Sequence, residues 1–451
     1  MRKGMGPVQG RDTQPQHAEI IVEVGGSASA PWLRLGAERF HLGADLSDRF
    51  GFDGCVLEED LLRIIVLLAM RRETQAEGWI SADEIGVLLK DGASGAAISK
   101  QFERILRNTP CAHGGHELGS GFRLIEYWTR ETGGTGPRGG RSRGPYRLGV
   151  RREQVRLDED IASAALTWRP LSRLEPLEGD IDAILEKVRV AASAGRFRES
   201  SSWLDALLLS IYRGNNELVA QSPRKERSML LARIWDATSI IDMEMGRPAD
   251  GLRAARRARA LYAISHHPEG IAHTWQVEAH LLGQSDDPEN AHRALAAARM
   301  SLVHLDSASR SNRRGIKRAQ YVGTLGQRLT VVGATQKAEK SLEHAYRTST
   351  EHGFIQPAAT WALRLAENAL KAKNLRGAEN LLMMSHERQQ QMSVPQRAAF
   401  ARIFAAFHGA SGHREAAQHW LAEALEIGER HQMLNQIRLV TQLERSLRRV
   451  R

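Results

Sequence analysis

The sequence predicts two architectures in one chain, an α+β domain over residues 19–158 and an all-α solenoid over residues 180–451. In the first region, short runs that alternate apolar and polar residues flank apolar helical patterns. In the second, a helix–turn–helix unit recurs about every 40 residues. With 451 residues, the chain is long enough for each region to bury its own core. We expect residues 1–18 to be a disordered tail and residues 159–179 to be a linker.

The basic charge is concentrated in one short segment. The formal net charge is +10, yet residues 1–99 carry ten basic and fifteen acidic side chains. Residues 100–156 carry twelve basic and five acidic side chains, whereas the remaining forty-one basic and thirty-three acidic side chains are spread over a much longer stretch. This local excess of +7 favours an anionic partner for residues 100–156.

Short strands and a core helix open the N-terminal domain. Alternating apolar residues predict antiparallel strands at Glu19 to Val24 and Trp32 to Leu42. Leu57 to Arg72 has a broad apolar face, which is typical of a core helix. Trp79-Ile80 is expected to add a short strand before a second helix, which Ser81 would cap at its N-terminus.

A third helix and a hairpin supply the basic surface. Ala96 to Asn108 is an amphipathic helical pattern with basic residues on its polar arc. Two strand patterns, Phe122 to Thr129 and Pro145 to Val150, then enclose a Gly-rich loop that carries several arginines. A guanidinium on a glycine-rich backbone can approach phosphates closely or fit a narrow minor groove. The simpler interpretation of the same charges is a solvated surface.

The order of strands, three helices and a C-terminal hairpin resembles the OmpR-type winged helix of response regulators and antibiotic-regulatory transcription factors. The matching segments are Gly78-Trp79-Ile80-Ser81, Ile98-Ser99-Lys100-Gln101-Phe102, Gly144-Pro145-Tyr146-Arg147-Leu148 and Val155-Arg156-Leu157-Asp158. The resemblance implies that Ala96 to Asn108 lies in the major groove of duplex DNA and that the hairpin, as the wing, lies beside the minor groove. The expected DNA-binding residues are Lys100, Arg104, Arg107, Arg138, Arg141, Arg143 and Arg147.

The C-terminal repeats share a small residue near the start of every second predicted helix. The residues in register are Gly251, Ala291, Ala338, Ala378 and Ala417, with Ser200 in a weaker earlier copy. One unit is longer than the others by roughly seven residues. A large apolar residue follows four positions later, as Leu382 follows Ala378, and this pairing allows close helix packing.

The repeated unit resembles the tetratricopeptide repeat, although its period is nearer 40 than 34 residues. The longer unit is also compatible with HEAT-like packing. Either arrangement is an α-solenoid with a concave face for a partner. Leu434 to Val450 would form the C-terminal capping helix.

Two groups of polar side chains have alternative interpretations. The basic residues of the enlarged repeat either hold an acidic partner, a nucleotide or a DNA backbone, or only solvate the start of a helix. They are Arg310, Arg313, Arg314, Lys317 and Arg318. Cys111, His113 and His116 could ligate a metal, but a structural zinc site usually needs four ligands at firmer spacings, which favours an ordinary insertion.

These features predict a DNA-binding transcriptional regulator whose repeats sense a ligand or recruit a protein partner. The alternative is a protein-interaction scaffold in which the repeats are the working part and DNA binding is a tether. A homodimer is expected because one winged helix covers few base pairs. The sequence has no phosphate loop, no His-Glu-x2-His and no Gly-x-Ser-x-Gly motif, so no enzyme activity, cofactor or metal is expected.

The expected location is the cytoplasm, in association with the nucleoid. The chain has only two cysteines, which argues against a disulfide scaffold and suits a reducing compartment. No apolar run reaches the roughly 18 residues of a membrane span.

Overall fold

The computed structural model describes residues 22–27, 30–35, 38–41, 58–74, 78–89, 125–127, 146–150, 152–158, 162, 166, 180–216, 219, 222–285, 287–308, 314–387 and 389–449. Contacts divide the chain into two compact units, residues 1–85 with 94–172 and residues 86–93 with 173–451. The predicted helix at Ala96 to Asn108 and the predicted tail at residues 1–18 lie outside the described residues.

A four-stranded sheet belongs to the first unit. Its strands are β1 (Val22–Ser27), β2 (Ala30–Leu35), β3 (Glu38–His41) and β6 (Val155–Leu157). The spatial order is β3-β2-β1-β6, with β1 antiparallel to β2 and parallel to β6. The prediction of one strand from Trp32 to Leu42 is wrong, because Leu35 pairs with Glu38 and the chain therefore reverses over two residues. In the sequence, Gly36 interrupts the alternating run, and a glycine between two alternating segments indicates a hairpin.

Two helices and a second pair of strands follow in the chain, with residues 86–89 of α3 assigned to the second unit and the rest to the first. They are α2 (Glu58–Thr74), α3 (Ala82–Leu89), β4 (Ile125–Tyr127) and β5 (Tyr146–Leu148), and the 3₁₀ turn η3 (Arg152–Gln154) leads into β6. Every residue of α2 from Ile64 to Met70 is buried, as its apolar face predicts. Strands β4 and β5 are antiparallel, and Ile80 forms a β-bridge with Tyr146. The predicted hairpin strands are therefore present, although each is shorter than predicted, whereas the predicted short strand at Trp79-Ile80 is only a single β-bridge at Ile80.

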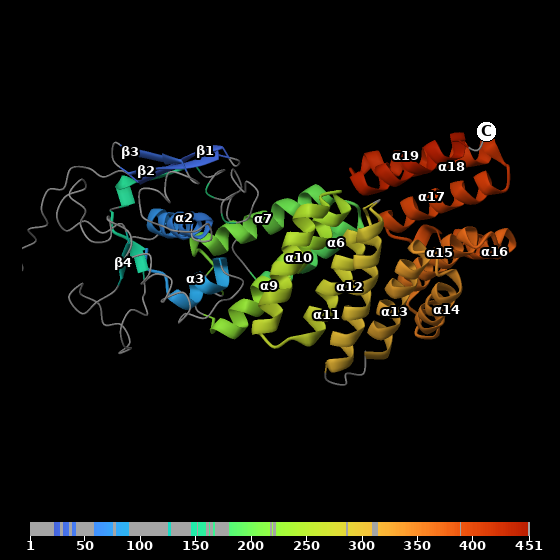
Figure 1. Ribbon diagram of the computed structural model, residues 1–451, viewed down its shortest axis with the longest axis horizontal. Coiled ribbons are helices and arrows are strands. Elements are labelled where there is room, and N and C mark those ends of the chain that lie inside the picture. The colour runs from blue at the N-terminus through green and yellow to red at the C-terminus, as the bar shows by residue number, and fades with distance from the viewer. Residues whose placement is uncertain are drawn as a thin grey trace, which may run out of the picture. The chain divides into compact units, whose positions relative to one another are not determined.

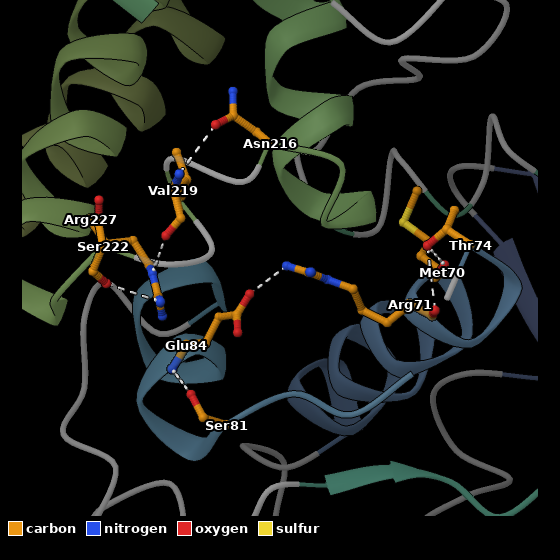
Figure 2. A network of polar contacts seen from close by, with 9 residues as sticks. All are labelled: Met70, Arg71, Thr74, Ser81, Glu84, Asn216, Val219, Ser222 and Arg227. Atoms are coloured by element: carbon orange, nitrogen blue, oxygen red, sulfur yellow. Dashed lines mark hydrogen bonds and ion pairs between the residues drawn. The ribbon is translucent and has the colours of Figure 1, made fainter. Parts of the chain in front are cut away.

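A buried ion pair joins α2 to α3 within the first unit (Figure 2). The Ser81 hydroxyl oxygen accepts a hydrogen bond from the Glu84 backbone N–H at 3.1 Å, which confirms Ser81 as the cap of α3. The Glu84 carboxylate accepts in turn from the Arg71 guanidinium at 2.5 Å. Because Arg71 is buried, loss of Glu84 would remove the carboxylate that offsets a buried positive charge.

The second unit is an array of antiparallel helix pairs (Figure 1). Its helices are α6 (Ile181–Ser193), α7 (Phe197–Arg213), α9 (Arg224–Glu244), α10 (Pro248–Ile264), α11 (Pro268–Leu282), α12 (Pro288–Ser307), α13 (Arg314–Val331), α14 (Thr335–Glu351), α15 (Ile355–Lys371), α16 (Leu375–His386), α17 (Val394–Ala410), α18 (Arg414–Arg430) and α19 (Leu434–Arg449). The 3₁₀ turn η4 (Gln389–Gln391) lies between α16 and α17. The prediction of an all-α solenoid of tetratricopeptide-like repeats is confirmed. None of the described helices is long and apolar enough to cross a membrane.

The predicted repeat register coincides with the helix starts. Each small residue in register is the fourth residue of the second helix of a pair, as Ala338 is in α14 and Ala378 in α16. Ala338 and Leu342 are completely buried, and so are Ala378 and Leu382. A larger side chain in place of either alanine would separate the two helices of the pair.

The first helices of the pairs lie side by side and form one face of the array. We call α9, α11, α13, α15, α17 and α19 the inner helices, because each contacts the next one in this series as well as its neighbour along the chain. The last inner helix, α19, also contacts the first, α9. At this contact Gly246, in the turn after α9, has a φ of +69°, and a Cβ there would overlap the Leu434 side chain. Helix α19, where the capping helix was predicted, is the last described helix of the array and packs on α17, α18 and α9.

Candidate functional site

A recess of about 380 Å³ lies among the inner helices. It is bordered by the C-terminal ends of α9, α11 and α13, by parts of α15 and α17, and by the first turns of α19. Five cationic side chains and two carboxyl groups line it, namely Arg328, Arg364, Lys371, Arg402, Arg438, Glu244 and Glu367. Its formal charge is therefore +3 when both carboxyl groups are ionised.

Glu367 pairs with two of these cations and offsets one positive charge. Its carboxylate pairs with Arg364 of the same helix at 2.9 Å and with Arg402 of α17 at 3.4 Å. Burial raises the pKa of Glu367, but the fields of Arg402 and Arg364 outweigh it and lower the pKa to about 2. Glu367 is thus ionised at any physiological pH, and both of its oxygens are already engaged by arginines.

Arg328 is a buried cation that forms no ion pair of its own in the described part of the chain. Its side chain is in a residue that is only 4% exposed, and it makes no ion pair or hydrogen bond with the described part of the chain. Burial, followed by repulsion from Arg364, lowers the pKa of Arg328 to about 10, although the charge of Glu367 partly opposes this fall. The guanidinium therefore stays charged at neutral pH. A buried guanidinium normally has a partner, because an isolated charge is costly to remove from water.

A glycine makes the space for Arg328. Gly283 follows α11, and a Cβ at this position would overlap the Arg328 guanidinium. The backbone of Gly283 has a φ of −72°, which any residue can adopt. Gly283 is therefore required here for close approach of the arginine and not for its backbone conformation.

The pKa values of two side chains in the recess are shifted by burial and by its cations. Burial, together with the charges of Arg328 and Arg364, lowers the pKa of His280 well below its usual value, so the imidazole is neutral at pH 7. Burial raises the pKa of Glu244 to about 7, and the charge of Arg364 opposes this rise only in part. When Glu244 is protonated, the formal charge of the recess becomes +4.

The inner helices carry a second polar region on the N-terminal side of the recess, reaching the middle of α9, α11 and α13. The His273 imidazole lies 2.7 Å from the Asp236 carboxylate, and this charge raises the pKa of His273 despite its burial. Gln276 donates from its amide to the Thr324 hydroxyl at 2.9 Å, and Lys317 of α13 pairs with Glu269 of α11. Side chains on successive inner helices are thus linked directly to one another.

The residues expected to bind DNA are mostly outside the described part of the chain. This holds for Lys100, Arg104, Arg107, Arg138, Arg141 and Arg143, and also for the Cys111, His113 and His116 loop. Arg147 is described in β5, where its guanidinium lies over the Trp79 ring, 4.3 Å from the ring centroid. This cation–π contact holds Arg147 against its own unit.

The basic residues of the enlarged repeat are not part of the recess. Arg310 and Arg313 lie outside the described residues, as does the side chain of Arg314 at the start of α13. Lys317 pairs with Glu269, and Arg318 pairs with Asp306 at 3.2 Å. The two that can be placed fully are therefore already neutralised by acids of their own unit.

The cations of the recess were missed because they are scattered in the sequence. Glu244 and Arg438 are 194 residues apart in the sequence (438 − 244), and the curvature of the array brings their helices together. One local signal was present. Arg328 follows Tyr321 and Leu325 on the buried side of α13, a place where helical periodicity calls for an apolar residue.

No family model and no curated protein matches this chain. Among solved structures, it is similar to a Podosopora anserina putative kinesin light chain with nearly identical TPR-like repeats. A point-mutant form of that protein aligns at 16% identity with a TM-score of 0.33, over 47% of this chain and 99% of the other. A further structure of the repeats aligns at 15% identity with a TM-score of 0.30, over 44% and 95%. At such low similarity, the repeat architecture rests on the helix pairs described above.

Proposed function

We propose that this protein is an interaction scaffold whose helical repeats bind a protein partner along the inner helices. The observation that carries the proposal is the linked polar surface that crosses α11, α13 and their neighbours. Helix-pair arrays offer such an extended face because each unit contacts only its neighbours and leaves one side uncovered.

The polar links favour a partner that binds through hydrogen bonds. Gln276 bridges to Thr324, and Gln396 of α17 donates to the Thr360 hydroxyl of α15 at 2.7 Å. These amides and hydroxyls are held in place by their neighbours before any partner arrives, which lowers the entropic cost of binding. An extended segment of a partner protein would exchange hydrogen bonds with the partly exposed Gln276, Gln396 and Thr360, whereas the buried Thr324 only holds Gln276 in place.

The test is affinity capture from native extracts with matched variants of the full chain. Gln276→Ala with Lys317→Ala alters the inner helices, whereas Gln336→Ala with Lys340→Ala makes the same chemical changes on exposed positions of α14. Proteins enriched by the wild-type chain should be retained by the α14 variant and lost by the inner-helix variant. Equal recovery by both variants, or no enrichment by the wild-type chain, would contradict the proposal.

The first unit supports a second candidate function, namely duplex DNA binding by an OmpR-type winged helix. What supports it is the succession of a sheet, α2, α3 and the β4–β5 pair, with Ile80 bridged to the hairpin, as that fold would require. In this proposal Lys100, Arg104 and Arg107 contact the major groove and the wing arginines contact phosphates. Transcription regulation and a homodimer remain predictions that go with it.

The DNA proposal is tested by the salt dependence of binding. Each phosphate contact that is lost should lower the slope of log affinity against log salt by about 0.9. Replacing Arg138, Arg141 and Arg143 with Ala in the full chain should therefore flatten the slope by up to roughly 3. An unchanged slope would remove the wing from the phosphate contacts, and a wild-type chain that does not bind duplex DNA at low salt would refute the second function itself.

A further inference from the structure

We propose that the recess among the inner helices binds a small molecule that carries a doubly charged oxyanion, either a phosphate-type group or a pair of carboxylates, with Arg328 as the principal anchor. This site goes beyond the proposed function, because it lies at the C-terminal ends of α9, α11 and α13 and requires no protein partner. Three features of the recess support it.

The first feature is a deficit of negative charge at a buried place. Glu367 pairs directly with Arg364 and Arg402 and acts on Arg328 only through space, which leaves Arg328 without a carboxylate in direct contact in the described part of the chain. The Nε atoms of Arg328 and Arg402 are both buried, and neither has a hydrogen-bond acceptor in the described part of the chain. A planar guanidinium presents its donors as a fork that fits two oxygens of a carboxylate, phosphate or sulfate.

The second feature is that the space is shaped around the arginine. The absence of a side chain at Gly283 allows the Arg328 guanidinium to approach the end of α11. The recess of about 380 Å³ is within the range of small-molecule sites, which are usually a few hundred Å³. Because α19 contacts both α17 and α9, it closes one side of this space and favours a compact ligand over a threaded chain.

The third feature is a second set of polar groups that suits an oxyanion. The Lys371 ammonium donates to the Thr330 carbonyl at 3.4 Å at the margin of the recess, and the buried Gln436 side chain also lines it. Glu244 makes no hydrogen bond in the described part of the chain. Its protonated carboxyl group can donate one to a ligand oxygen, whereas its ionised form repels an anion.

Binding is tested on the full chain with sulfate, inorganic phosphate and succinate as probes, by equilibrium dialysis at constant ionic strength in chloride. The wild-type chain should bind at least one of these dianions more tightly than chloride. Arg328→Gln should weaken that binding by at least about tenfold, because it removes a charge-assisted hydrogen bond. Arg299→Gln, an exposed position on α12, should leave it unchanged.

Gly283→Ala provides a second, independent variant. It keeps every charge of the recess but displaces the Arg328 guanidinium, so dianion binding should fall in a chain whose melting temperature is close to that of the wild type. Binding of sulfate and phosphate but not succinate would assign a phosphate-type ligand, and the reverse would assign a dicarboxylate.

Two results would overturn the inference. One is a wild-type chain that binds none of the three dianions, and the other is equal binding by the wild type, Arg328→Gln and Gly283→Ala. Neither result bears on partner capture, which is measured with the Gln276 and Lys317 variant. Conversely, a chain that binds sulfate but captures no protein would refute the proposed function and leave this site intact.

Discussion

Replacement of Arg328 by methionine should stabilise the free protein while abolishing its affinity for dianions. The methionine side chain is shorter than that of arginine but has a comparable volume, and it adapts well to irregular space. A residue that serves only to hold the fold together would behave in the opposite way, because its loss would destabilise the chain. The substitution therefore separates a binding role for Arg328 from a structural one.

The size of the effect follows from the cost of keeping this guanidinium charged inside the protein. The pKa of Arg328 falls from 12.5 to about 10. At about 1.36 kcal/mol for each pKa unit, the folded state loses roughly 3 kcal/mol at neutral pH, where Arg328 is protonated in both states. Replacing buried ionic groups with apolar ones of similar volume has stabilised other proteins by about 1–4 kcal/mol. We expect a gain of about 1–3 kcal/mol for Arg328→Met, since water in the recess screens part of the cost.

Thermal unfolding followed by far-UV circular dichroism measures this gain. In a chloride buffer without dianions, the melting temperature should rise by roughly 2–8 °C. Added sulfate should raise the melting temperature of the wild type and leave that of the variant unchanged, because only the native wild-type chain binds it. A lower melting temperature for Arg328→Met in chloride would show that Arg328 already has partners within the protein, and the reasoning above would fail.

Three further predictions concern pH and packing. The affinity for sulfate should increase when the pH is lowered from about 8 to about 6, because Glu244 becomes protonated and loses its negative charge. Glu367 stays ionised and His280 stays neutral over this range. The Glu244→Gln variant should lose this pH dependence when sulfate binding is measured by equilibrium dialysis. The His273→Asn variant should lose more stability at about pH 5.5 than at about pH 8.5 when unfolding is followed in urea. Asp236 raises the pKa of His273 in the folded state, so the ion pair stabilises the protein below the unfolded-state pKa and this contribution is lost above the folded-state pKa. An equal loss of stability at both pH values would refute the ion pair. Ala378→Leu should lower stability by about 1–3 kcal/mol by overpacking the α15–α16 pair, and a loss no greater than that of an exposed change such as Glu379→Leu would contradict the proposed register.

The repeat array could be predicted from the sequence because its signal is local and periodic. Ala338, Ala378 and Ala417 are spaced by about 40 residues, and a small residue followed by a large apolar one is what a close helix pair needs. These positions are the fourth residues of α14, α16 and α18, and all are buried. The start of α3 could be predicted from a similarly local signal, the cap residue Ser81 followed three residues later by Glu84.

The recess could not be predicted because its residues meet only after the array has curved. Glu244, Arg328 and Arg402 belong to α9, α13 and α17, and no sequence motif connects them. Charge density pointed instead to the segment from Arg310 to Arg318, of which Lys317 and Arg318 are paired with acids on their own unit. A run of cations in a sequence does not show whether each is paired with an acidic side chain. A single cation on the apolar face of a helix, by contrast, needs a counter-ion, either from the protein itself or from a bound ligand.

The central claim, that the inner helices are the partner-binding face, is tested most directly by site-specific photo-crosslinking in cells. A photoreactive residue in place of Gln320 would lie on the inner helix α13, between Lys317 and Thr324, and the same residue in place of Gln336 would lie on the exposed side of α14. We predict a covalent adduct with a specific protein from position 320 and none from position 336. Adducts from position 336 alone, or the same adducts from both positions, would contradict the account.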